Sequence, residues 1–292
     1  EILYTPHTRP ENDFTRLIEA DDPVKFWSSY PANIEPPRDN NPFFFNSIRL
    51  SNLPSALEEA DKWRTTNLGT YVLVVALGFT AVLVVLFMIG PLAIARGREL
   101  AEGSTRKYSY LTYFACLGAG FMIVEIALIQ KFILFLGHPV YALAVVLFSL
   151  LTFSAVGSHL SGRFSDATRL NGLVKVIGGL VALTVIYIFV LPPIFYGLVH
   201  LGIGSRIIIA VALMAPLALM MGVPMPTGIR ILADAAPGII PWAWGVNGAT
   251  SVMGSLAALV IAILTGFNQA LLVGAGLYLV GLFLIRRAAT IR

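Results

Sequence analysis

Charged side chains are scarce in this chain. Asp, Glu, Lys and Arg make up 12% of its 292 residues, hydrophobic residues make up 57%, and the mean hydropathy is +0.79. This composition leaves too little polar surface to solvate a globule of this length. It therefore excludes a soluble enzyme.

Residues that usually build catalytic, redox or metal centres are also few. The single cysteine, Cys116, cannot form an internal disulfide. Gly118-Ala119-Gly120 resembles part of a dinucleotide fingerprint, but it lies in an apolar run with no strand before it. No serine lies in a nucleophile elbow, and the four histidines show no paired metal spacing: His7, His138, His159 and His200. We therefore predict no catalytic residue, cofactor site or metal site in this chain.

What the chain does have is seven long apolar runs, between Asn67 and Arg287. A run of about 20 residues matches the roughly 30 Å hydrocarbon core of a bilayer, so each run predicts a spanning helix. The predicted spans are 68–95, 108–136, 139–161, 172–195, 205–224, 241–265 and 269–286. The predicted fold class is all-α: a polytopic membrane bundle of about seven helices, with residues 67–292 as the membrane module.

The basic residues predict the orientation of this bundle. The net charge of +4 suggests lipid and topology rather than nucleic acid, because the basic residues lie in short connections between the apolar runs. One side carries eleven of them: Arg96, Arg98, Arg106, Lys107, Arg163, Arg169, Lys175, Arg230, Arg286, Arg287 and Arg292. The other side carries Lys62, Arg64 and Arg206, and we expect Lys131 to reach an interface by extending its stem. The positive-inside rule then places the C-terminus in the cytoplasm and the N-terminal segment outside.

Residues 1–66 form a polar extramembrane segment without a long apolar run. It is short for an independent domain, so we interpret it as the tail of a preceding domain and expect the chain to be part of a longer protein. No secretory leader pattern is visible at Glu1. Cap residues and an early proline predict a helix start within 51–60, and Trp63 is expected at the membrane surface.

Glu125 lies near the middle of the second predicted span, where an ionisable group costs a few kcal/mol and usually faces the bundle interior. The small residues on its helix face predict close contact with a neighbouring helix. Glu125 could be a proton-relay carboxylate, a counter-charge for a cation, a cofactor ligand, or a structural group that locks two helices together. Arg230 and Asn247 are its candidate partners across helices.

Two further patterns concern the helix backbone. The run Met221–Gly228 contains Pro224 and Pro226 and cannot continue a regular helix. Such a break marks either a substrate site, as in transporters, or a helix end at the cytoplasmic surface. In the sixth span small residues recur every four positions and predict close helix packing: Gly254, Ala258, Ala262 and Gly266.

Several phrases of the sequence together resemble the membrane-embedded spermidine-synthase-like proteins of bacteria. They occur in order over roughly residues 36–267. The phrases are Asp39–Phe45, Gly120–Lys131, Leu136–Ala142, Gly157-Ser158 with Gly162-Arg163, Met221–Pro226, and Trp242–Ala249.

In that family, multi-helix membrane modules accompany an aminopropyltransferase-like Rossmann domain. The resemblance implies that this chain is the C-terminal membrane module of such a protein, in the bacterial cytoplasmic membrane. The family's catalytic residues and its S-adenosyl-type cofactor would then lie upstream of Glu1, and none carries over to this chain. Asn40 and Asn41 stand where the family tends to have an acidic and a basic residue, which weakens the expectation that the attached domain is active.

Three functional hypotheses remain open. The chain is the membrane module that anchors or feeds an aminopropyl- or methyltransferase-like domain, or it is a transporter of a polyamine or another cation that uses Glu125 and a hinge at Pro224 and Pro226. The third hypothesis is a non-catalytic subunit bound to other membrane subunits.

Overall fold

The structure is a computed structural model that describes residues 4–5, 7, 9–52, 67–91 and 104–290. Several features expected from the sequence lie outside the described residues: the helix start after Asn52, Trp63, Lys62, Arg64, Arg96, Arg98, Arg292 and the end of the first predicted span. The chain divides into two compact units, residues 1–71 and 72–292. Each is described by itself.

The first unit holds two short helices that the sequence analysis did not predict, α1 (Asp13–Ile18) and α2 (Pro23–Ser29). Both begin at a side-chain cap: Asn12 accepts a hydrogen bond from the Thr15 amide at 2.9 Å, and Asp22 accepts one from the Val24 amide at 3.0 Å. Helices of 6 and 7 residues show little periodicity of their own, so their caps are their clearest sequence signal.

Hydrogen bonds from two side chains hold the rest of this unit together. Arg49 donates to the Ser28 carbonyl at 3.0 Å, and this bond ties α2 to the 3-10 turn Leu50–Asn52. Asn67 accepts a hydrogen bond from the Ser47 amide at 2.8 Å, which fixes the chain just before the first long helix. The Tyr30 hydroxyl donates to Asp13 at 2.6 Å, and this bond raises the pKa of Tyr30.

The second unit is built from long helices, and the structure confirms the all-α prediction with seven helical segments long and apolar enough to cross a membrane. The described residues form no strand, and one isolated bridge pairs Arg38 with Asn41. The helices are α5 (Leu68–Val84, continued by a π turn Val85–Ile89), α7 (Ser104–Leu136), α8 (Pro139–Ser161), α9 (Arg169–Leu198), α10 (Ile203–Met221), α11 (Pro224–Ala235), α12 (Ile240–Thr265) and α13 (Phe267–Thr290).

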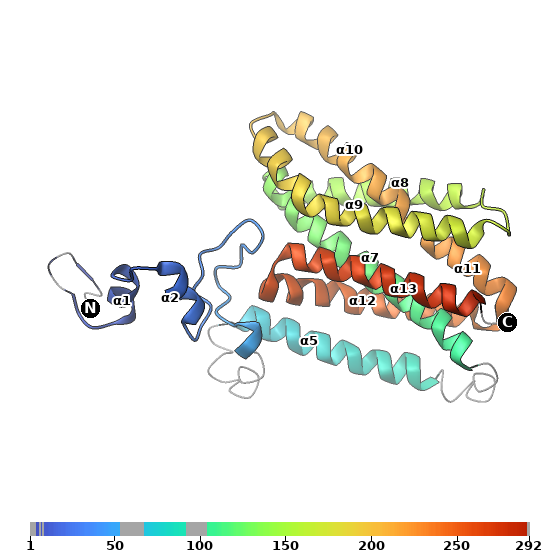
Figure 1. The fold of residues 1–292 in the computed structure, drawn as a ribbon, viewed down its shortest axis with the longest axis horizontal. Coiled ribbons are helices and arrows are strands. Elements are labelled where there is room, and N and C mark those ends of the chain that lie inside the picture. Colours follow the sequence, from blue (N-terminus) through green and yellow to red (C-terminus); the bar gives the residue numbers. More distant parts are fainter. Residues whose placement is uncertain (1–3, 6, 8, 53–66, 92–103, 291–292) are drawn as a thin grey trace. The chain divides into compact units, whose positions relative to one another are not determined.

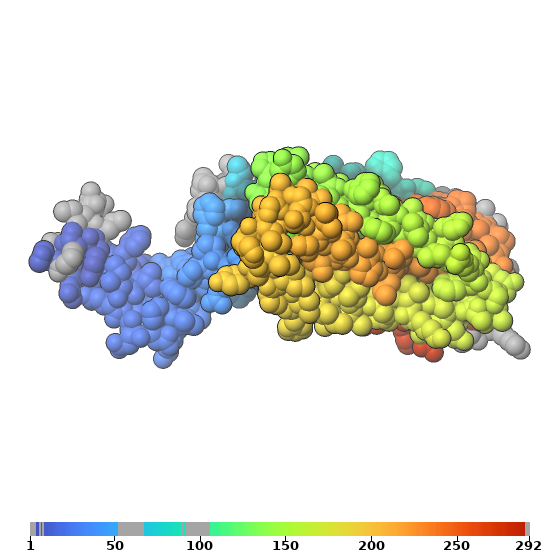
Figure 2. Space-filling view, turned by 90° about the horizontal axis from the view of Figure 1, so that it is seen from above, coloured from blue at the N-terminus to red at the C-terminus, as the bar shows by residue number. Residues whose placement is uncertain are grey.

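Helix α7 is the centre of the bundle. It packs most extensively against α12 and α13, and it also contacts α8 and α9 (Figure 1). It is also the most deeply buried of the seven candidate spans, because 61% of its most apolar 18-residue stretch is enclosed by the rest of the protein. On the face drawn in Figure 2, α10 lies between α8 and α9, in agreement with the contacts of α10 with both helices.

Small residues let the helices of this core approach closely. A Cβ atom added at Gly118 of α7 would lie 2.2 Å from the Asn247 carbonyl oxygen of α12, and one added at Gly254 would lie 2.7 Å from the Ala119 Cα. The glycines that resemble part of a dinucleotide fingerprint therefore serve helix packing. The small-residue stripe predicted on the sixth span is buried, as expected for such a ridge: Ala258 and Ala262 are each 1% exposed.

The turn between α7 and α8 depends on glycine and on a basic side chain. Gly137 has φ +79°, which a side chain would strain, and His138 then caps α8 by accepting a hydrogen bond from the Val140 amide at 3.2 Å. Arg206 of α10 donates to the Phe135 carbonyl at 2.9 Å, near the end of α7. A cation at this end also suits the negative pole of the helix dipole.

The outer surface of the bundle is strongly apolar. Phe79 of α5 is 63% exposed, Phe189 of α9 is 72% exposed and Ile208 of α10 is 71% exposed. So much exposed apolar surface is unfavourable in water, and it suits contact with the lipid tails of a bilayer. Lys131 corrects one expectation: its side chain is 6% exposed, so it is enclosed by protein rather than extended to an interface.

Candidate intramembrane site

The fifth span bends at a break between two helices. α10 ends at Met221, Gly222 and Val223 form a turn, and α11 begins with Pro224 in its first turn. Proline suits a helix start because its missing N–H is one that the first turn leaves unbonded. The span that was predicted to end at 224 therefore continues, after this interruption, to Ala235.

Neighbouring helices hold the break tightly. A Cβ atom added at Gly222 would lie 2.0 Å from the Ser154 carbonyl oxygen of α8, and one added at Gly157 would lie 2.0 Å from the Leu219 carbonyl oxygen. On the other side, the Tyr113 hydroxyl of α7 donates to the Pro224 carbonyl at 2.7 Å. Irregular backbone at membrane depth is thus covered by protein, as the absence of water from the bilayer requires.

A cavity of about 670 Å³ adjoins this break. Its wall combines apolar groups with several polar side chains, and five helices besides α11 contribute to it. The lining residues are Leu117, Gly118 and Phe121 of α7; Leu151, Ser154, Ala155 and Ser158 of α8; Met221, Gly222, Pro224, Met225, Pro226, Ile229 and Arg230 around the break; Trp244, Asn247 and Ser251 of α12; and Tyr278 of α13. A volume of this size is typical of a small-molecule site.

The cavity has an open side. Leu151 of α8 and Trp244 of α12 both line it, and they are 68% and 58% exposed. The cavity therefore opens to the bundle surface at these two helices. Because both residues lie within candidate spans, this surface is the one that faces lipid.

Arg230 is the charged residue of the wall. Its Nη2 donates to the Ser161 carbonyl and to the Ser161 hydroxyl, the latter at 3.0 Å, which orients the guanidinium from the end of α8. Its Nε is buried without a hydrogen-bond partner, and no carboxylate among the described residues forms an ion pair with it. A guanidinium in this position keeps donors for something that the protein does not supply.

Asn247 serves the packing of α12 on α7 as well as the cavity wall. Its Nδ2 donates to the Phe114 carbonyl at 3.0 Å. The backbone carbonyl of Asn247 accepts a hydrogen bond from the Ser251 hydroxyl at 2.8 Å. One amide side chain and one hydroxyl from the same helix therefore present polar atoms next to the cavity.

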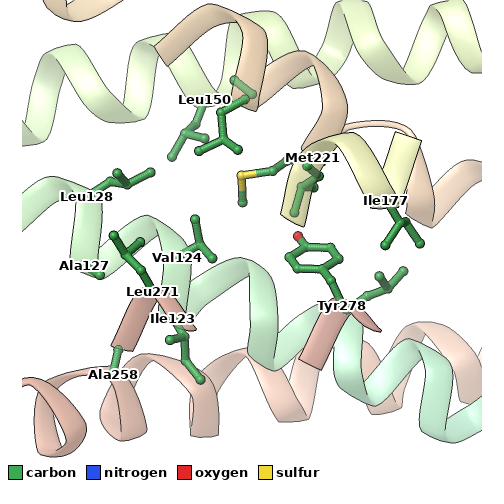
Figure 3. Close-up of a cluster of buried hydrophobic side chains, with 14 of the residues drawn as sticks. Ile123, Val124, Ala127, Leu128, Leu150, Ile177, Met221, Ala258, Leu271 and Tyr278 are labelled. Carbon is green, nitrogen blue, oxygen red and sulfur yellow. The ribbon is translucent and has the colours of Figure 1, made fainter. Parts of the chain in front are cut away.

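Glu125 is buried but is not among the residues that line the cavity. It is 7% exposed and has no hydrogen-bond partner or ion pair among the described residues. Arg230 and Asn247, its candidate partners, bond instead to Ser161 and Phe114. Tyr278, which lines the cavity, has its hydroxyl pointing toward the region of Met221 in Figure 3.

The structure thus brings four of the five candidate residues to one wall: Arg230, Asn247, Pro224 and Pro226. The sequence analysis did not single out Ser154, Tyr113 or Tyr278. Tyr113 and Tyr278 are 0% and 1% exposed and sit in apolar runs, where a tyrosine counts as hydrophobic in any composition window. Their phenol groups inside predicted spans were the available signal.

Neither a metal nor a known relative identifies the site. Among the described residues, no group of three or more His, Cys, Asp or Glu side chains could hold a metal ion. Comparison with protein-family models, with curated proteins and with solved structures gives no match to this chain. The class that the fold supports is a multi-pass membrane module.

Proposed function

We propose that this chain is the integral-membrane module of a spermidine-synthase-like protein and that it anchors an aminopropyl- or methyltransferase-like domain. The cavity beside the helix break is, in this proposal, a binding site for a small molecule. In this proposal the chain lies in the bacterial cytoplasmic membrane with its C-terminus inside and residues 1–66 outside. Any S-adenosyl-type cofactor belongs to the attached domain.

One observation carries the proposal of a binding site. The phrases on which the family resemblance rests are spread along more than 100 residues of the chain, yet residues from four of them line the same cavity: Phe121, Ser158, Met221 with Pro224, and Trp244 with Asn247. A plain membrane anchor needs only apolar length. A shared cavity with a helix break beside it is typical of intramembrane binding sites.

The enzyme part of the proposal is tested on the whole gene product. We expect the purified full-length protein to release 5′-methylthioadenosine from decarboxylated S-adenosylmethionine and putrescine, and the present chain alone to release none, because in this proposal the catalytic groups belong to the attached domain. The measurement is chromatographic detection of 5′-methylthioadenosine. Absence of turnover by the full-length protein would remove the enzyme claim and leave the membrane module.

Transport is the second candidate, and the break between α10 and α11 favours it. Interrupted helices next to a cavity supply polar backbone to substrates in secondary transporters. For a polyamine the charge is less favourable, because the wall carries the cationic Arg230 while Glu125 lies outside it.

The variant Glu125→Gln tests whether this carboxylate takes part in transport or serves helix packing. If Glu125 is the charged element of a cation transporter, the variant loses polyamine uptake in proteoliposomes while remaining folded. Cys116→Ser, at another buried position of α7, is the matched control and should transport normally. Unchanged flux in Glu125→Gln would assign Glu125 to helix packing.

A further inference from the structure

We infer that the cavity binds an amphipathic molecule with an anionic group, held by Arg230, and an apolar body that lies along the wall toward Phe121 and Met225. This inference rests on the proposal that the cavity is a binding site, and it names the ligand class.

The charge of the wall selects an anion. Arg230 is the one ionisable side chain among the residues that line the cavity, other than the tyrosine phenol of Tyr278. An uncompensated cation within a span is costly, and a counter-anion from a ligand would remove that cost. The Arg230 guanidinium is also oriented by its hydrogen bond to Ser161, and the Arg230 Nε has no hydrogen-bond partner in the described part of the chain. A carboxylate or phosphate oxygen matches such donors.

The rest of the wall selects an apolar body. Phe121, Ile229 and the two methionines Met221 and Met225 cover much of the surface, and methionine adapts to ligands of irregular shape. Because the cavity opens at Leu151 and Trp244, toward lipid, an apolar molecule reaches it from the bilayer. Arg230 lies within the last two turns of α11, so a charged head there lies near the membrane surface while the tail stays inside.

The test uses quenching of Trp244 fluorescence by brominated amphiphiles. The purified protein, in a neutral maltoside detergent and with its other three tryptophans replaced by phenylalanine, is titrated with 11-bromoundecanoate. The methyl ester of 11-bromoundecanoate and 11-bromoundecyl-trimethylammonium serve as neutral and cationic comparison probes. We expect saturable quenching by the carboxylate, and with the other two probes only the linear quenching that micelle partition gives.

Arg230→Gln should weaken binding of the carboxylate by about 10- to 100-fold, the worth of a charge-assisted contact. Arg206→Gln is the matched control, since Arg206 bonds to the Phe135 carbonyl and is absent from the cavity wall, and it should bind as the unsubstituted protein does. If Arg230→Gln does not fold, the selectivity among the three probes in the unsubstituted protein decides the question alone.

The possible results distinguish a loss of anion selectivity from the absence of a binding site. Equal, saturable quenching by all three probes would keep the binding site and overturn its anion selectivity. Absence of saturable quenching by any probe would overturn both. A parallel titration in phosphatidylcholine nanodiscs with brominated phosphatidylglycerol distinguishes the two sources of the anion. Saturable quenching by the brominated lipid assigns the site to a lipid headgroup. Quenching by 11-bromoundecanoate alone assigns it to a smaller amphiphile.

Discussion

Replacing Gly157 with alanine is expected to lower the free energy of unfolding by about 3 kcal/mol or more, at the upper end of what overpacking costs. The added Cβ would lie 2.0 Å from the Leu219 carbonyl oxygen and 3.2 Å from the Leu219 Cα. The obstacle is backbone, which cannot rotate away as a side chain could. α8 and α10 must therefore separate, and the contact that fixes the break at Gly222 is lost.

The measurement is unfolding of the purified protein in detergent, followed by the loss of helical circular dichroism with heat. Gly178→Ala is the matched control, because Gly178 also lies within a long helix and a Cβ there meets nothing within 4 Å. Alanine should be neutral or stabilising at Gly178 by about 0.5–1 kcal/mol, since it restricts the unfolded chain. Equal stability of the two variants would contradict the close approach of α8 and α10.

Much of the fold could be predicted from the sequence, because lipid imposes a simple requirement. A helix must be apolar for about 20 residues to cross the bilayer, and seven such runs stand out in the chain. The predicted span 139–161 coincides with α8, where Gly137 and Pro139 mark the start. The span predicted at 172–195 extends to Arg169–Leu198, because neither the polar residues of its first turn nor Pro192 and Pro193 near its end interrupt the helix.

The arrangement of the site could be predicted only in part. Periodicity shows which residues share a face of one helix, but it does not show which faces of different helices meet. Glu125 stood out by its charge, yet the cavity wall is formed one turn away, at Phe121, and by groups from other helices. Ser154 and Tyr278 do not change the apolar character of their runs, and only the packing of α8 and α13 gives them a place at the cavity.

The central claim is that a seven-span membrane bundle holds a cavity with several polar side chains in its wall, beside the break between α10 and α11. Water enters a cavity that is roomy and lined by polar groups, and here Ser154, Ser158, Asn247 and Arg230 supply them. A cysteine at Ser154 would then face water at membrane depth, and an aqueous reagent would reach it from the Arg230 end of the cavity, which lies near the membrane surface. Val156, nearer the end of α8, is 45% exposed on the outside and is not a lining residue, so a cysteine there would face lipid.

The measurement is the reaction rate of single cysteines with an anionic, membrane-impermeant methanethiosulfonate, on protein in nanodiscs and with Cys116 replaced by alanine. Thiolate is the reacting form and does not persist in lipid, so we expect Ser154→Cys to react at least about 100-fold faster than Val156→Cys. Depth alone would give the opposite order, because Ser154 is farther from the end of α8. Equal, slow rates at both positions would contradict the cavity, and equal, fast rates would contradict the membrane span itself.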